Sequence, residues 1–269
     1  MGSMRKTRII VPCYNESKRI NPKAFLCALE KDLNLSFLFV NDGSADETLN
    51  VLKSIKEKKP AQVEVVSLEK NSGKAEAVRR GILKALEGQF DNVGYWDADL
   101  ATPLDAIEVF CRLLDSTDAE IVIGSRVRLL GRKIERRAMR HYLGRIFATC
   151  ASMLLDISIY DTQCGAKIFR NSASLRQVFG KPFKVKWIFD VEMFARFSIV
   201  MGASPSEISS RWVEYPLDEW GDVKGSKIKG KDFIKGGIEF SILYFYLCTP
   251  ARKVYERYLL GIVPKKNVF

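Results

Sequence analysis

The sequence predicts an α/β fold in which a mainly parallel β-sheet is flanked by helices. Short strand-like runs alternate with helical patterns up to residue 125. These runs are mainly apolar, as in strands that are buried on both faces of a parallel sheet. The 269-residue length and 47% hydrophobic content suffice for one large domain with a substantial core, with or without an appendage.

Five strand-like runs rich in β-branched or aromatic residues are expected in this first part of the chain. They cover Thr7–Val11, Ser36–Val40, Val63–Leu68, Val93–Trp96 and Glu120–Ile123. Ligands of open parallel sheets bind at the carboxyl ends of the strands. The residues that follow Val11, Val40 and Trp96 are therefore expected to lie at one edge of the sheet.

Four helical patterns fill the gaps. Asn21-Pro22 supplies an N-cap and a first-turn proline for the first helix, and Ser44-Ala-Asp-Glu47 has the pattern of a capping box for the second. Ser72-Gly73 and Thr102-Pro103 are expected to open the third and fourth helices.

Beyond residue 125 the regular alternation is lost, and isolated elements are expected instead. Helices are expected over Tyr142–Leu155 and about Asp190–Val200, and strands over Ala166–Phe169 and Ser210–Tyr215.

The net charge of +11 is concentrated in two stretches. The basic residues are Arg126, Arg128, Arg132, Lys133, Arg136, Arg137, Arg140 and Arg145, then Lys224, Lys227, Lys229, Lys231 and Lys235. Such stretches suit a nucleic acid, an anionic membrane or a phosphorylated ligand, although a solvated basic face is the alternative. Nucleic acid is disfavoured because the basic runs lack interleaved stacking aromatics and no recognised module is present.

Cysteine and histidine usage excludes some chemistry. The six cysteines show no Cys-x-x-Cys spacing and no secretory signal precedes them, so reduced thiols in a cytosolic protein are expected. A single histidine, His141, leaves little scope for a Ser-His-Asp triad or an imidazole-bound metal.

Asp97-Ala98-Asp99 directly follows a predicted strand. Two carboxylates near one point provide the hard oxygen ligands that a divalent cation bridging phosphates needs. Solvated loop carboxylates can produce the same pattern, so context matters. Two further polar clusters follow earlier strands, Val11-Pro12-Cys13-Tyr14-Asn15-Glu16 and Val40-Asn41-Asp42-Gly43-Ser44.

This trio of motifs, in this order, resembles family 2 glycosyltransferases over about Arg8 to Lys235. The resemblance implies a fold of the glycosyltransferase A type. Within the family, the chain is most similar to polyprenyl-phosphate sugar synthases, especially the dolichyl-phosphate glucosyltransferase and mannosyltransferase group. The motifs that carry this likeness are Asp97-Ala-Asp-Leu-Ala-Thr-Pro103, Gly124-Ser-Arg126, Asp161-Thr-Gln-Cys-Gly-Ala-Lys167, Phe189-Asp-Val-Glu192 and Gly225-Ser-Lys227.

The resemblance implies a nucleotide-sugar site and a divalent cation that neutralises the leaving diphosphate. The implied donor-binding residues are Pro12, Tyr14, Glu16, Asp42, Lys74, Asp97, Ala98 and Lys227, with Asp97 and Asp99 as ligands of Mg²⁺ or Mn²⁺. Asp42 could accept from a base N–H or be a turn residue. Gly73-Lys74 could favour phosphate at a helix N-terminus or simply begin the helix.

The acceptor decides which side chains are needed. A sugar hydroxyl requires a carboxylate base, whereas a phosphate monoester is already an anionic nucleophile and needs cationic positioning. Arginine binds phosphate bidentately, and Arg126 and Arg137 are the first candidates. Asp161 lies where relatives place an active-site carboxylate. Asp190 and Glu192 mark either a second acidic site or a helix N-terminus.

The expected reaction is an inverting, metal-dependent transfer of a sugar from a nucleotide-sugar to a polyprenyl phosphate. Trp220-Gly-Asp-Val stands where some mannosyl relatives carry an arginine, which favours UDP-glucose-like donors over GDP-mannose. The alternative is a family 2 transferase that acts on a saccharide hydroxyl. A more remote alternative is a non-enzymatic, basic nucleic-acid-binding protein.

A catalytic domain is expected over residues 4–235, followed by a C-terminal helical segment over residues 236–269. The apolar run Phe240–Cys248 has nine residues, whereas about 20 are needed to span a bilayer. This run and the helix Tyr142–Leu155 are expected to be amphipathic and to dock on a membrane surface, unless both pack in the core. The expected location is peripheral, on the cytoplasmic face of a membrane.

Overall fold

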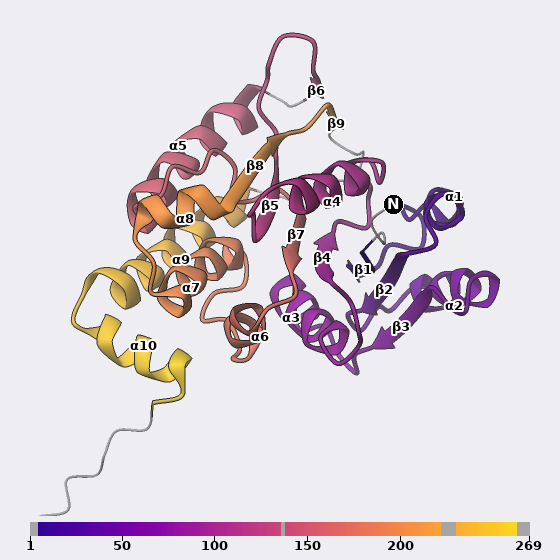
Figure 1. Cartoon of the computed structure of the whole chain (residues 1–269), viewed down its shortest axis with the longest axis horizontal. Coiled ribbons are helices and arrows are strands. Elements are labelled where there is room, and N and C mark those ends of the chain that lie inside the picture. The colour runs from indigo at the N-terminus through magenta and orange to yellow at the C-terminus, as the bar shows by residue number, and fades with distance from the viewer. Residues whose placement is uncertain (1–4, 136–137, 222–229, 263–269) are drawn as a thin grey trace, which may run out of the picture.

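The structure, a computed structural model, describes residues 5–135, 138–221 and 230–262 (Figure 1). A seven-stranded sheet of order β3-β2-β1-β4-β7-β5-β8 runs through the molecule. Its strands are β1 (Thr7–Cys13), β2 (Leu35–Asn41), β3 (Val63–Ser67), β4 (Asn92–Trp96), β5 (Ile121–Ser125), β7 (Ala166–Arg170) and β8 (Trp212–Pro216). All neighbouring pairs are parallel except those of β7, which runs antiparallel between β4 and β5. The predicted mainly parallel sheet is confirmed.

The helices flank the sheet on both faces, as Figure 1 shows. They are α1 (Pro22–Lys31), α2 (Thr48–Lys58), α3 (Lys74–Ala85), α4 (Ala106–Ser116), α5 (Ala138–Leu155), α6 (Ala173–Phe179), α7 (Phe189–Met201), α8 (Pro205–Arg211), α9 (Gly230–Cys248) and α10 (Ala251–Leu260). Because strand residues alternate between faces, Ile9 and Val11 pack with α1, α2 and α4, while Ile10 packs with α3 and α7 on the other side. A small parallel pair that the sequence did not predict, β6 (Lys133–Glu135) and β9 (Glu219–Gly221), lies beside the main sheet.

Two predicted helix starts are wrong, and long-range contacts explain both. α2 begins at Thr48 because the Ser44 hydroxyl accepts from Asn15 N (3.0 Å) instead of capping the helix. α4 begins at Ala106, since the preceding residues form a turn and the Thr102 carbonyl accepts from the Trp96 indole (2.8 Å). The Asn21 cap is confirmed, because its side chain accepts from the backbone N–H of Ala24.

The C-terminal helices belong to the core that covers one face of the sheet. Leu243 and Leu247 of α9 and Tyr255 and Leu259 of α10 are buried there with α7. The expected boundary at residue 235 falls inside α9. No helix within the described ranges combines the length and apolar character that crossing a bilayer requires.

Candidate active site

A cavity of about 880 Å³ opens at the carboxyl ends of β1, β2 and β4. The loops that follow these strands form one wall, and the segment before β7 forms the floor. α5, α7 and α9 contribute the opposite wall. The predicted meeting of polar strand-end residues at one sheet edge is therefore confirmed.

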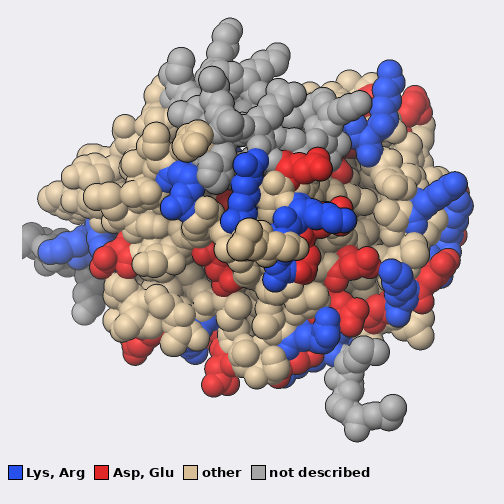
Figure 2. Space-filling view, turned by 90° about the horizontal axis from the view of Figure 1, so that it is seen from above, with Lys and Arg blue, Asp and Glu red and all other residues tan. Residues whose placement is uncertain are grey.

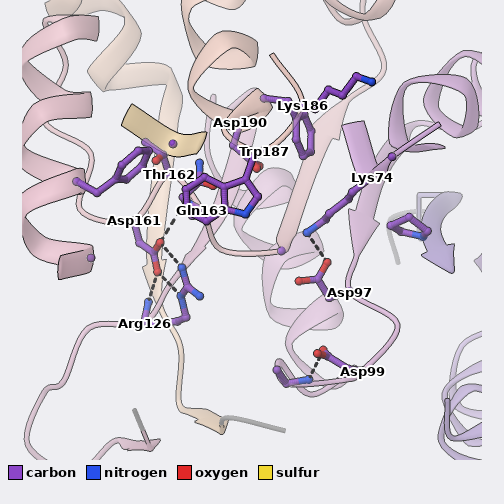
Figure 3. A pocket seen from close by; sticks show the side chains of 18 of the residues that line it. Lys74, Asp97, Asp99, Arg126, Asp161, Thr162, Gln163, Lys186, Trp187 and Asp190 are labelled. Carbon is purple, nitrogen blue, oxygen red and sulfur yellow. Dashed lines mark hydrogen bonds and ion pairs between the residues drawn. The ribbon is translucent and has the colours of Figure 1, made fainter. Parts of the chain in front are cut away.

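Two acidic side chains at the end of β4 each pair with a basic one, and Figure 3 shows the pair of Lys74 and Asp97. Lys74 Nζ lies 2.6 Å from an oxygen of Asp97, and Arg19 Nη2 lies 2.9 Å from an oxygen of Asp99. Burial and the nearby Asp97 charge raise the pKa of Asp99. Burial opposes the charge on Lys74, but the negative charges of Asp97 and Asp190 raise its pKa overall.

Gly165 sets the position of Asp97. Its carbonyl accepts from the Asp97 backbone N–H at 2.9 Å. A Cβ atom at Gly165 would lie 1.9 Å from a carboxylate oxygen of Asp97, so the carboxylate rests directly against the glycine backbone. Any side chain at position 165 would displace Asp97.

The acidic pair fits a divalent cation that is shared with a ligand. The described residues contain no cluster of three or more His, Cys, Asp or Glu side chains able to hold a metal. Mg²⁺ commonly binds through one or two carboxylates and completes its octahedron with substrate phosphates and water. Asp97 and Asp99 would be the carboxylate ligands that the protein provides. The charge of Asp97 contributes to the raised pKa of Asp99, and a cation bound between the two carboxylates would relieve that repulsion.

Asp42 lines the same cavity but is already engaged. The residue is 2% exposed. Its two carboxylate oxygens accept from the backbone N–H groups of Ser72 (2.7 Å) and Gly73 (2.8 Å). Gly73 has a φ of 92°, which favours glycine, and α3 begins at the next residue, Lys74. Asp42 thus holds the turn that places Lys74 opposite Asp97.

Arg126 and Asp161 form a bidentate pair on the far side of the cavity (Figure 3). Nε and Nη2 of Arg126 lie 2.6 and 2.7 Å from the two Asp161 oxygens, and both side chains are largely buried. Burial disfavours the charged guanidinium, but the charge of Asp161 and its hydrogen bonds raise the pKa of Arg126 overall. No described residue accepts from Nη1 of Arg126, so this edge can bind a ligand. The guanidinium also lies over the Trp220 ring at 5.3 Å.

Part of the cavity lining is apolar and comes from α5 and α9; this part is called the apolar arm. Phe147, Ala148 and Cys150 line it from α5, and Phe240 lines it from α9. Trp187 packs on Gly236, where a Cβ atom would lie 2.5 Å from the indole ring. At the mouth of this arm, the Arg145 guanidinium lies 4.2 Å above the Tyr160 ring.

Asp190 lies at the floor of the cavity in a buried ion pair. Its carboxylate accepts from Lys167 Nζ at 2.7 Å and from the Tyr95 hydroxyl. Lys167 is fully buried, and it also donates to the Cys164 carbonyl at 2.5 Å. Burial, followed by the charge of Asp190, raises the pKa of Tyr95 well above its usual value.

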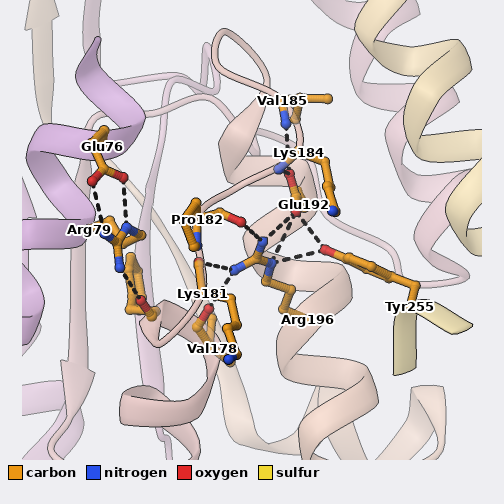
Figure 4. A network of polar contacts seen from close by, with 11 residues as sticks. Glu76, Arg79, Val178, Lys181, Pro182, Lys184, Val185, Glu192, Arg196 and Tyr255 are labelled. Carbon is orange, nitrogen blue, oxygen red and sulfur yellow. Dashed lines mark hydrogen bonds and ion pairs between the residues drawn. The ribbon is translucent and has the colours of Figure 1, made fainter. Parts of the chain in front are cut away.

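Glu192 is the centre of a buried polar network behind the cavity (Figure 4). One oxygen accepts from Arg196 Nη2 (2.7 Å) and the Tyr255 hydroxyl (2.5 Å), and the other accepts from the N–H groups of Lys184 (2.7 Å) and Val185 (3.0 Å). The network joins α7, the 180–187 segment and α10. These contacts assign Glu192 a structural role.

The structure brings most of the predicted site together. The cavity is lined by Pro12, Tyr14, Glu16, Asp42, Lys74, Asp97, Ala98, Asp99, Arg126 and Asp161. Arg137 and Lys227 lie outside the described residues. The cavity lining also includes residues that the sequence analysis did not assign to the site, among them Arg19, Arg145, Thr162, Gln163, Trp187 and Phe240. Thr162 and Gln163 lie inside a motif that carried the resemblance, whereas Trp187 and Phe240 have no sequence signal.

Comparison with named proteins identifies the family of the chain. Residues 8–176 match the model of glycosyl transferase family 2. A dolichyl-phosphate beta-glucosyltransferase from Trichomonas vaginalis is 31% identical over 253 residues, covering 89% of this chain and 71% of the relative. The dolichyl-phosphate beta-glucosyltransferase of Homo sapiens is 31% identical, with 83% and 70% coverage.

Solved structures with low sequence identity share the fold. Glucosyl-3-phosphoglycerate synthase from Mycobacterium tuberculosis, crystallised with Mn²⁺, UDP and glucosyl-3-phosphoglycerate, superposes with a TM-score of 0.62 at 17% identity, covering 91% of this chain and 81% of that one. S. aureus TarS 1-349 has a TM-score of 0.55 at 16% identity, with 95% and 69% coverage. The chain belongs to glycosyl transferase family 2 and is a glycosyltransferase with a fold of the glycosyltransferase A type.

Proposed function

We propose that this glycosyltransferase transfers a sugar, glucose rather than mannose, from a UDP-sugar to a polyprenyl phosphate with inversion. The observation that carries the proposal is the lining of the cavity, which combines the charged side chains of Asp97, Asp99, Lys74 and Arg126 with the apolar arm. A prenyl phosphate combines an anionic head with an apolar tail. The names of the Trichomonas and human relatives agree with this acceptor class.

The donor would lie at the charged end. Pro12, Tyr14 and Glu16 would hold the base and ribose, and the turn held by Asp42 would bring Lys74 to the diphosphate. Mg²⁺ or Mn²⁺, held by Asp97 and Asp99, would neutralise the leaving nucleoside diphosphate. The Mn²⁺ and UDP in the mycobacterial neighbour are consistent with this donor class.

The acceptor phosphate would lie between Arg126 and Arg145. An oxygen of the phosphate attacks the anomeric carbon while the bond from that carbon to the nucleoside diphosphate breaks on the opposite face. This nucleophile is already an anion, so no proton needs to be removed. Nη1 of Arg126 is available, and Asp161 fixes the guanidinium plane.

The hydrogen bonds made by the carboxylates of Asp161 and Asp190 favour a phosphate over a saccharide hydroxyl as the acceptor. Both Asp161 oxygens accept from Arg126, and Asp190 accepts from Lys167 and Tyr95. Both carboxylates are already engaged by these donors, so neither is placed to take the proton of a hydroxyl. Figure 2 shows the face of the molecule seen from above the view of Figure 1, and on it acidic side chains lie among the described basic ones. This mixture of charges suits a discrete phosphorylated ligand better than nucleic acid.

A membrane surface is the proposed source of the acceptor. Large apolar side chains are exposed on the helices that border the apolar arm and on α10. They are Tyr142, Ile146, Met153, Ile238, Tyr244, Phe245 and Val254. These side chains would dock at the lipid surface on the cytoplasmic face, with α9 and α10 as the interfacial segment of a catalytic domain.

A crossed donor and acceptor screen tests the proposal. Purified protein with Mn²⁺ is given UDP-glucose or GDP-mannose, together with a short-chain prenyl phosphate or free sugars, and products are identified by mass spectrometry. We expect glucosyl prenyl phosphate from UDP-glucose, with inverted anomeric configuration by NMR. Turnover with free sugars and none with prenyl phosphate would establish the saccharide alternative instead.

A further inference from the structure

The segment before β7 carries two polar atoms, on residues that line the cavity, that have no partner among the described residues. They are the hydroxyl oxygen of Thr162 and the amide nitrogen of Gln163, and both atoms are buried. Thr162 is 1% exposed, and both residues line the cavity. Burying a hydrogen-bonding group without a partner is costly, so such groups in a cavity indicate a ligand or an ordered water.

The segment that carries these atoms is held rigidly at both ends. At one end Asp161 pairs with Arg126, and its backbone N–H donates to Glu214 at 2.7 Å. At the other end Gly165 lies against Asp97. The backbone N–H of Gln163 donates to Asp161 at 3.2 Å. Thr162 and Gln163 are therefore fixed in place before any ligand arrives, which lowers the entropic cost of binding.

The position of this segment identifies the part of the substrate it would meet. The chain passes from the residue that holds Arg126 to the residue that abuts Asp97, so the backbone of Thr162 and Gln163 connects the two charged groups. Given the proposed function, the donor diphosphate occupies the Asp97 side and the acceptor phosphate the Arg126 side. The group that lies between them is the transferred sugar.

The chemistry of the two side chains points to a neutral ligand. A hydroxyl and an amide donate and accept without charge, as recognition of sugar hydroxyls requires. We propose that Thr162 and Gln163 form the subsite that binds hydroxyl groups of the transferred sugar. This inference rests on the proposed function.

Isosteric variants with donor analogues test the subsite. Thr162→Val and Gln163→Leu remove the polar atoms with little change of shape, and Thr162→Ser restores the hydroxyl. Calorimetry with Mn²⁺ and no acceptor compares UDP with UDP-glucose. We expect UDP affinity within about twofold of wild type and UDP-glucose affinity lowered roughly 10–100-fold, the effect of leaving one polar group of the complex without its partner. Gln89→Leu, an exposed glutamine outside the cavity, is the matched control.

Deoxy donors identify the contact itself. UDP-glucose analogues that each lack one hydroxyl should bind more weakly to wild type. For the hydroxyl that a side chain contacts, removing that side chain should cause no additional loss, whereas the other hydroxyls should still matter. Thr162→Ser should restore the wild-type pattern.

Several results would overturn the inference. Equal losses for UDP and UDP-glucose would indicate a general disturbance of the cavity, and unchanged UDP-glucose affinity would mean that water alone satisfies these atoms. If wild type binds GDP-mannose instead, GDP and GDP-mannose replace the UDP pair. Because no acceptor is present, a saccharide acceptor would refute the proposed function without touching this result.

Discussion

Glu239 of α9 accepts a hydrogen bond from the backbone N–H of Trp187 at 2.8 Å. Its carboxylate also accepts from the N–H groups of Lys186 (3.2 Å) and Ile188 (3.0 Å). These groups lie at the start of α7, where backbone donors have no partner within the helix. Trp187 and Asp190 line the cavity from the same segment. One carboxylate therefore connects the proposed interfacial helix to the wall of the cavity.

Removal of this carboxylate should disturb the acceptor side more than the donor side. We expect Glu239→Ala to lower the free energy of unfolding by roughly 1–3 kcal/mol, because partly buried N–H groups lose their acceptor. kcat/KM for prenyl phosphate should fall about tenfold while UDP affinity stays unchanged, and Glu239→Gln should retain most activity. A variant with wild-type kinetics would show that Trp187 and Asp190 are held by other contacts.

Metal dependence follows from the acidic pair. Removal of the metal with EDTA should abolish transfer reversibly, and Asp99→Ala should reduce kcat by roughly two orders of magnitude or more, since the diphosphate loses its charge compensation. Mn²⁺ binding, followed by electron paramagnetic resonance with UDP present, should weaken in the variant. Full activity under either condition would contradict the metal assignment.

Asp42 should matter for the donor. Asp42→Ala removes the acceptor of two backbone N–H groups and frees the turn before Lys74, so UDP affinity should fall by about tenfold or more. Asp42→Asn keeps one acceptor oxygen and should have an intermediate effect. Circular dichroism should show a retained fold. Unchanged calorimetric affinity in both variants would limit Asp42 to a turn residue.

Membrane docking should depend on both charge and apolar contact. Each basic side chain near an anionic leaflet contributes about 1 kcal/mol, which salt screens. We expect the protein to sediment with anionic liposomes at low salt and less so at high salt. Replacing Tyr244 and Phe245 with serine should weaken binding, whereas Leu33→Ser, at an 83% exposed leucine far from α9, should not. Equal recovery in the supernatant with and without liposomes at low salt would exclude docking.

The side of the cavity proposed to bind the donor could be predicted from the sequence because its residues follow strand ends. Asp42 and Asp97 come directly after apolar runs, and parallel strands bring their carboxyl ends to one edge. The acceptor side could not be predicted in this way. Trp187 and Phe240 lie on separate segments that come together only through tertiary packing, and no local pattern reports that packing. The long-range hydrogen bond from the Asn15 N–H to the Ser44 hydroxyl likewise has no local sequence signal.

The apolar arm offers the most direct test of the central claim that the acceptor is a prenyl phosphate. A Cβ atom at Gly237 would meet no atom within 4 Å, and the residue lines the cavity, so Gly237→Leu should fill the arm without disturbing the helix. The measurement is kcat/KM of this variant for a prenyl phosphate, with calorimetric UDP affinity alongside and Ser241→Leu, on the same helix but outside the cavity lining, as control. We predict a fall of about tenfold or more in prenyl phosphate turnover with unchanged UDP affinity. Wild-type turnover of prenyl phosphate by Gly237→Leu would contradict the account.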